Sequence, residues 1–133
     1  MSTIQEFFVM IKPDGVKRGL IGEIISRFEK KGFKIKEMKS VSPSREMIVK
    51  HYEEYSNKVF FNRLVNTVSS GRIIAIIMEG NIDLARRKVV GKPNPLESES
   101  GTIRGDYATS MNENLIHCSD SIQSAKREIE LWF

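Results

Sequence analysis

Two continuous apolar stretches constrain the fold of this chain more than any other feature. Residues 7–11 read Phe-Phe-Val-Met-Ile, and residues 73–78 read Ile-Ile-Ala-Ile-Ile-Met. Apolar runs of this length without alternation are typical of strands that are buried on both faces of a sheet. We therefore predict two central strands. The length of 133 residues fits one domain, spanning residues 1–133, around a single core.

Helical periodicity and one alternating stretch fill the sequence around these two runs. The alternation begins at Phe33 and slips by Met38, which predicts a half-solvated strand over residues 33–41 with a bulge or an edge. Helices are predicted around residues 20–28, 42–52, 60–68, 82–90 and 120–132. Residues 91–113 show little periodicity and form a long loop, which in a compact domain is usually functional or disordered.

The resulting order of elements is β-α-β-α-α-β-α-loop-β-α, which indicates an α/β (α+β) fold of the ferredoxin-like βαββαβ type. In that arrangement we expect a four-stranded antiparallel sheet with its helices on one face. Phe60 and Phe61 open one of the predicted helices. Because adjacent residues cannot share a helix face, one is expected in the core and the other toward solvent or a ligand.

Composition excludes several classes of protein. Hydrophobic residues make up 40% of the chain and charged residues 29%, the balance of an ordinary globular protein. No apolar run approaches the roughly 20 residues that span a bilayer, and the first six residues lack the layout of a secretion signal. The single cysteine, Cys118, cannot form an internal disulfide, so we expect a reducing, cytoplasmic compartment. The net charge of +4 suits a phosphate-bearing small molecule.

Residues 114–121, Asn-Leu-Ile-His-Cys-Ser-Asp-Ser, are the strongest candidate for chemistry. His117 follows an apolar pair and precedes a helical pattern in which Asp120 and Gln123 resemble a capping box. We therefore place His117 beside a helix N-terminus, which favours anions. Glu128 is predicted to reach His117 Nδ1 and leave Nε2 free to attack. A histidine with a purely structural hydrogen bond is the commoner alternative, and these eight residues alone favour it.

Four segments together resemble the nucleoside diphosphate kinase family. Residues 114–121 closely resemble its active-site signature, Asn-x-x-His-[Gly/Ala]-Ser-Asp-[Ser/Gly]. Residues 11–16 (Ile-Lys-Pro-Asp-Gly-Val), residues 94–95 (Asn-Pro) and residues 101–106 (Gly-Thr-Ile-Arg-Gly-Asp) resemble three further segments, in the family's order and nearly at its spacing. The resemblance covers nearly the whole chain and implies the same ferredoxin-like fold.

The resemblance also implies an activity. Members of the family move a γ-phosphate between nucleotides by a ping-pong route through phosphohistidine, with Mg²⁺ as cofactor. His117 would be the nucleophile, and Ser119 and Glu128 would orient it. Mg²⁺ would be held mainly by nucleotide phosphates and water rather than by residues of the chain. Phosphoryl transfer depends above all on positioning and charge neutralisation, which the remaining matches would supply.

The resemblance implies binding of nucleoside di- and triphosphates by two arginines. Arg87 and Arg104 match the phosphate-binding pair, whose planar guanidinium groups can bind phosphate oxygens bidentately. Arg86 remains an alternative to Arg87, because the chain is about one residue short between Gly80 and Gly91.

Four further side chains complete the site that the resemblance implies. Lys12 and Asn114 match the residues that hold the sugar 3′-hydroxyl and polarise the γ-phosphate. Tyr52 matches a tyrosine that packs near Lys12 and His117. Phe60 matches the aromatic residue that stacks on the base, an interaction that tolerates many bases.

Two departures from the family pattern leave open a catalytically weakened or inactive member. Cys118 stands where the family has a small residue, usually Gly, and Pro93 stands where it carries a Thr or Ser that binds phosphate. The other alternative is an RNA-binding ferredoxin-like module, because residues 31–33 (Lys-Gly-Phe) faintly resemble a motif of RNA recognition domains. Ile35 replaces the second stacking aromatic, so nucleic acid is not expected as a partner.

The resemblance implies a homo-oligomer built from dimers, either a tetramer or a hexamer. Dimers of the family pair edge strands, and residues 33–41 are the candidate edge here. Longer, hexameric members carry a C-terminal extension beyond the position that matches Phe133. Without it, we expect at least a dimer and a hexamer less stable than in longer relatives.

Overall fold

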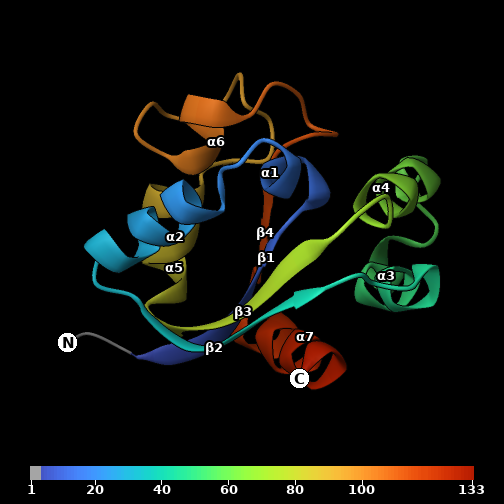
Figure 1. Ribbon diagram of the computed structural model, residues 1–133, viewed down its shortest axis with the longest axis horizontal. Coiled ribbons are helices and arrows are strands. Elements are labelled where there is room, and N and C mark those ends of the chain that lie inside the picture. The colour runs from blue at the N-terminus through green and yellow to red at the C-terminus, as the bar shows by residue number, and fades with distance from the viewer. Residues whose placement is uncertain (1–3) are drawn as a thin grey trace.

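The sheet has four antiparallel strands in the order β2-β3-β1-β4 (Figure 1). They are β1 (Gln5–Ile11), β2 (Lys34–Val41), β3 (Ile73–Gly80) and β4 (Ile116–Cys118) in the computed structural model, which describes residues 4–133. The two apolar runs, β1 and β3, are the central strands, as predicted. The strand order and the crossovers confirm the ferredoxin-like fold. The predicted absence of a secretion signal concerns a segment that lies partly outside the described residues.

Helices cover both faces of the sheet, so the expectation that they lie on one face was wrong (Figure 1). On one face lie α2 (Ile21–Lys30), α5 (Ile82–Leu84) and the π-helical segment η2 (Ala85–Val90). On the other lie α3 (Arg45–His51), α4 (Phe61–Val68) and α7 (Ile122–Trp132). The physical reason is visible in β1, where Phe7 faces the first layer and Phe8 the second. An apolar side chain on each face must be covered.

Several short elements escaped the sequence analysis. The turn after β1 is a short helix, α1 (Pro13–Lys17), and η1 (Glu53–Tyr55) follows α3. The predicted helix over residues 82–90 is a single α-helical turn that continues as η2. The long loop over residues 91–113 contains α6 (Ile103–Tyr107). Among residues 4–133, no helix is long and apolar enough to cross a membrane.

The predicted edge strand is confirmed. β2 pairs only with β3 within the described sheet, and its register shifts between Ile35 and Glu37, close to the predicted bulge. Gly32 adopts a left-handed φ of 98° just after α2, the conformation that commonly ends a helix.

The last strand and the last helix position the site. β4 pairs with β1 through three residues, placing His117 opposite Met10. A backbone hydrogen bond joins the turn after β1 to the segment before β4. The Lys12 N–H donates to the Leu115 carbonyl at 2.8 Å. α7 then packs against β1 on the other side of the sheet from α2.

Candidate active site

The structure has a cleft of about 1040 Å³. One side is formed by η2 and the loop that follows it, and the other by the start of α4. Its lining includes eight of the nine predicted site residues, namely Lys12, Tyr52, Phe60, Arg87, Arg104, Asn114, His117 and Glu128. The ninth, Ser119, is fully buried behind them. The fold therefore brings segments that are far apart in the sequence together around one cleft.

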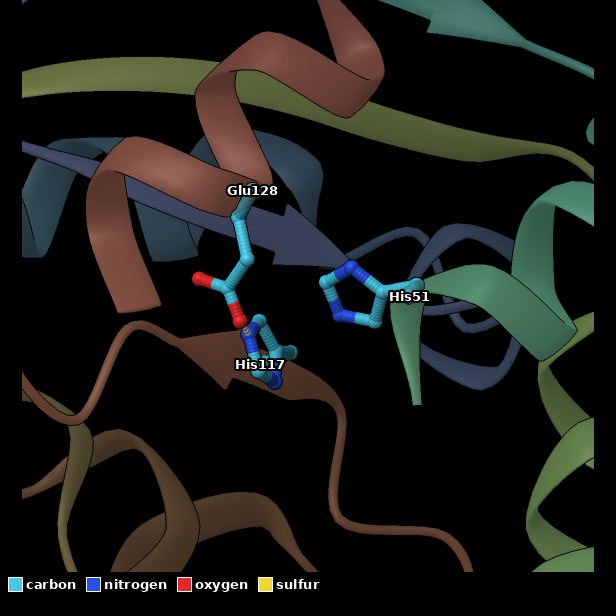
Figure 2. Close-up of side chains that lie close together, drawn as sticks. All are labelled: His51, His117 and Glu128. Carbon is cyan, nitrogen blue, oxygen red and sulfur yellow. Dashed lines mark hydrogen bonds and ion pairs between the residues drawn. The ribbon is translucent and has the colours of Figure 1, made fainter. Parts of the chain in front are cut away.

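His117 and Glu128 form the centre of this site (Figure 2). His117 Nε2 lies 2.8 Å from Glu128 Oε2, and the carboxylate is almost fully buried, with 2% of its residue exposed. A carboxylate can only accept, so a neutral His117 carries its proton on Nε2 and its lone pair on Nδ1. The predicted partnership of the two residues is therefore correct, but the predicted nitrogen was wrong. Nδ1, not Nε2, is the atom available for attack.

Ser119 orients the carboxylate of Glu128. Its Oγ donates to Glu128 Oε1 at 2.6 Å and accepts from the backbone N–H of Phe8 at 2.9 Å. Each oxygen of Glu128 thus has its own partner, Ser119 on one side and His117 on the other. A buried carboxylate needs such partners because burial alone would penalise its charge.

Helix α7 begins one residue later than the prediction. Its N-cap is Ser121, whose side chain accepts from the Ser124 N–H, so the proposed capping box at Asp120 and Gln123 is wrong by one residue. The contact of α7 with His117 comes from Glu128, as predicted, in the second half of the helix. Ala125 and Trp132 of α7 are buried.

Lys12 and Asn114 hold one another beside the histidine. Lys12 Nζ donates to Asn114 Oδ1 at 2.9 Å, and Asn114 Nδ2 donates to the carbonyl of Pro93 at 3.2 Å. Burial of Lys12, followed by the charge of Arg104, lowers its pKa to about 7, although Asp14 acts in the opposite direction. Near neutral pH the ammonium is thus poised between its charged and neutral forms.

The backbone between Asn114 and His117 is strained. Leu115 has a φ of 76°, the left-handed region that a branched side chain rarely adopts. A residue held there costs of order 1–3 kcal/mol. The conformation is maintained by the Leu115 N–H, which donates to Asp14 Oδ2 at 3.0 Å, and by its carbonyl, which accepts from Lys12 N–H. This turn places Asn114 and His117 on the same cleft.

Arg104 plays a structural part that the sequence did not reveal. Its guanidinium donates to the carbonyls of Gly91, Asn114 and Ile116 at 3.1, 3.4 and 2.6 Å. Burial lowers its pKa to about 10, so it still carries its charge at neutral pH. Three of five N–H donors are thus used on backbone, leaving two for a ligand. Arg86 and Arg87 are exposed, and both line the cleft.

The aromatic residues divide into one buried and one open position. Tyr52 is buried, its hydroxyl has no hydrogen-bond partner among residues 4–133, and burial raises the pKa of that hydroxyl. Phe60 is 49% exposed at the cleft, whereas Phe61 is partly buried and packs against the core. The divided roles of the Phe pair are therefore confirmed.

Cys118 also lines the cleft, next to the histidine. Burial is the largest cause that raises the pKa of its thiol to about 12. A thiol is a far weaker nucleophile than a thiolate. Cys118 therefore does not compete with His117 for an electrophile at neutral pH.

His51 is the residue near the site that sequence reasoning did not select. It ends α3 and is 1% exposed, and its ring centroid lies 4.4 Å from that of His117. Its only sequence signal was its place beside Tyr52 at a helix end. Nothing in the spacing indicates that α3 would bring it against β4.

Comparison with known proteins decides the family. The family model described as nucleoside diphosphate kinase matches residues 5–133. The chain belongs to the nucleoside diphosphate kinase family. It is 54% identical over 131 residues to nucleoside diphosphate kinase 1 of Arabidopsis thaliana, covering 98% of this chain and 88% of that one.

Solved structures of the family share the same fold. A family protein from Babesia bovis is 44% identical with a TM-score of 0.91. An apo nucleoside diphosphate kinase from Encephalitozoon cuniculi is 42% identical with a TM-score of 0.94. Each alignment covers 97% of this chain and 88% of the other.

Proposed function

We propose that the protein transfers the terminal phosphate of a nucleoside triphosphate to a nucleoside diphosphate through a phosphohistidine at His117. The observation that carries this proposal is the pairing of His117 Nε2 with Glu128 Oε2 at 2.8 Å inside a cleft. It leaves the Nδ1 lone pair without a hydrogen bond to residues 4–133. Membership of the family supports the same activity.

The chain's own groups account for both half-reactions. Nδ1 of neutral His117 forms a bond to the γ-phosphorus while the bond from phosphorus to the bridging β-phosphate oxygen breaks, and the nucleoside diphosphate departs. The ring then holds its charge through the Nε2–H that donates to Glu128. A terminal oxygen of a second nucleoside diphosphate attacks the phosphorus in return, and His117 regains its lone pair.

Charge neutralisation comes from the cations of the cleft. Lys12 and Arg104 are buried, and each donates a hydrogen bond to Asn114, three residues before His117. Arg87, or Arg86, is exposed on η2. Its side chain can turn toward phosphate without breaking a hydrogen bond or ion pair to residues 4–133. Fixed cations in a site from which water is partly excluded stabilise developing charge better than the same groups in water.

Phe60 and Asn114 account for the nucleoside. Phe60 presents its ring at the cleft, and Tyr55 packs behind it at a ring distance of 5.9 Å. A base stacked on this ring is recognised without reading its hydrogen-bonding edge, so we expect several bases to be accepted. The amide of Asn114, held by Lys12 and the Pro93 carbonyl, is suited to a sugar hydroxyl.

Mg²⁺ fits this site as a companion of the phosphates. The carboxylate nearest to His117, Glu128, already has a partner on each oxygen, so it offers no free ligand. The cation would therefore be held by phosphate oxygens and water, as Mg²⁺ prefers. When bound, it would neutralise phosphate charge alongside Lys12 and Arg104.

The RNA-binding alternative finds little support. Such modules stack bases on an open sheet face, whereas helices cover both faces here, and Phe33 is buried in the core. The weakened-enzyme alternative rests on Pro93 and Cys118. A cytoplasmic location, proposed from the single cysteine, can be tested by fractionation.

The test begins with the purified protein and ATP with Mg²⁺. Intact-mass analysis should show one added phosphate that is labile to acid and stable to base, and that is absent in His117→Ala. A coupled assay should then record ATP formation from ADP and a second triphosphate. No adduct on the native protein, or an adduct that persists in His117→Ala, would overturn the proposal.

A further inference from the structure

His51 lies buried between His117 and Trp132. Its ring is 4.4 Å from that of His117 at an interplanar angle of 76°, and 5.8 Å from that of Trp132. Figure 2 shows the His51 ring projecting from α3 toward the pair formed by His117 and Glu128. It is not among the residues that line the cleft. His51 can therefore influence a ligand only through the cleft residues that it contacts, His117 and Tyr52.

The hydrogen bond from Trp132 determines the tautomer of His51. Trp132 Nε1 lies 3.0 Å from His51 Nδ1, and both side chains are buried. An indole N–H can only donate, so Nδ1 must accept and hold a lone pair. A neutral His51 then carries its proton on Nε2. That nitrogen has no hydrogen-bond partner among residues 4–133, and Figure 2 shows one ring nitrogen of His51 turned toward His117.

The surroundings of His51 keep it neutral. Burial is the largest cause that holds its pKa well below the usual value, followed by the charges of His117, Arg127 and Lys12. Arg127 of α7 also donates to the His51 carbonyl at 3.2 Å, which fixes the end of α3. Tyr52, on the other side of the ring, is a neutral phenol. Glu128, whose carboxylate has an oxygen within 4.8 Å of a His51 nitrogen, already accepts from His117 and Ser119.

We propose that His51 is a positioning residue for His117. Its Nε2–H, fixed by Trp132, is directed at the imidazole of His117 and holds that ring with Nε2 toward Glu128 and Nδ1 toward the cleft. The positive end of the same N–H dipole faces the His117 ring. This inference rests on the proposed function, in which Nδ1 is the nucleophile.

A metal site is the competing explanation for the same cluster. His51, His117 and Glu128 offer donor atoms within 4.8 Å of one another, a set of ligands that zinc also uses. A ligating nitrogen needs its lone pair, however, and the lone pair of His51 is committed to Trp132. The proton on Nε2 would have to leave, so the tautomer favours positioning over coordination.

The first experiment compares His51→Phe with His51→Gln by single-turnover phosphorylation from ATP. Phenylalanine keeps a ring but has no N–H, whereas the glutamine amide can place a donor near the position of Nε2. We expect the phosphorylation rate of His51→Phe to fall about two- to fivefold, the effect of losing one weak N–H contact with a ring. The acidic limb of its pH profile should move to higher pH, with KM unchanged. His51→Gln should recover most of the rate.

The second experiment measures the tautomer directly by nitrogen NMR of the native protein. We expect a protonated Nε2 and an unprotonated Nδ1 for His51, and a loss of this preference in Trp132→Phe. Circular dichroism and thermal unfolding would show that each variant is folded. Equal rates and pH profiles for the native protein, His51→Phe and His51→Gln would overturn the proposal, as would an Nδ1–H tautomer in the native protein.

The two proposals fail differently. Absence of phosphate on the native protein rejects the proposed function, while the tautomer measurement still tests His51. Phosphorylation of His117 with no response to the His51 variants rejects the positioning role alone. Binding of Zn²⁺ to the native protein that is lost in His51→Phe would replace positioning with coordination and would also overturn it.

Discussion

Burial holds several ionisable side chains of the site near or in their uncharged forms before any ligand arrives. It lowers the pKa of Lys12 to about 7 and that of His51 well below its usual value, and it raises that of Cys118 to about 12. Such groups change their protonation when a charged ligand enters. Binding of a nucleotide should therefore be coupled to protons.

Lys12 provides the clearest test of this coupling. Its pKa of about 7 in the free protein means that it is mostly neutral at pH 8. A bound phosphate favours the charged form and raises that pKa, so binding should take up a proton, approaching one per site. Calorimetry in buffers of different ionisation enthalpy measures this number directly. Uptake should vanish in Lys12→Met, and uptake that survives in that variant would assign the proton to another group.

Pro93 is the second residue with a measurable consequence. Its carbonyl accepts from Asn114 Nδ2, but it has neither a hydroxyl nor an N–H to offer to phosphate. Restoring such a donor is worth about 1–3 kcal/mol when the partner is otherwise unsatisfied. Pro93→Thr should therefore raise kcat/KM about tenfold. Unchanged kinetics and nucleotide affinity would mean that the neighbouring loop already compensates.

The residues of the site were largely predictable, but their orientations were not. Motif spacing brought Lys12, Asn114 and His117 to one place, which the cleft confirms. Spacing cannot tell which edge of an imidazole faces a carboxylate, so Nδ1 was chosen where Nε2 is used. His51 was missed for a related reason, because its contact with His117 depends on how α3 packs against the sheet.

At the scale of elements, apolar patterning succeeded where it was unambiguous. Continuous runs marked β1 and β3, and a slipped alternation marked the bulge in β2. The same runs also implied that both faces of the sheet are buried. The prediction that helices cover one face did not take this into account and was wrong. α6 was missed because five residues give too little periodicity against the loop around them.

α6 depends on Gly105 at its centre. A Cβ added there would overlap the backbone carbonyl of Glu99, whereas one added at Gly22 of α2 would meet nothing within 4 Å. Gly105→Ala should destabilise the protein by about 1–3 kcal/mol and weaken nucleotide binding, because Arg104 moves with the helix. Gly22→Ala, the matched control, should stabilise by about 0.5–1 kcal/mol. Denaturant unfolding compares them, and equal effects would contradict this account of α6.

At the scale of the whole molecule, the unpaired edge of β2 is the feature that predicts association with a second copy of the chain. Most of its residues are exposed, including Met38 at 50%, and it pairs only with β3 within residues 4–133. An unprotected edge tends to pair with another chain. We expect at least a dimer, with tetramers or hexamers built from it. Light scattering across a dilution series measures this, and a strict monomer at micromolar concentration would refute the edge-strand argument.

The position of β1 has a consequence for synthesis on the ribosome. Of the four strands described, β1 is the first to be made, yet it lies in the middle of the sheet, and its neighbours are β3 and β4, the third and the fourth. The bond between Phe8 and Ser119 joins residues 111 positions apart. The nascent chain therefore carries the apolar residues 7–11 of β1 without their sheet partners until β3 and then β4 have been translated. Its catalytic centre can assemble only after α7 has been translated, and until then β1 is an exposed apolar segment of the kind that chaperones recognise.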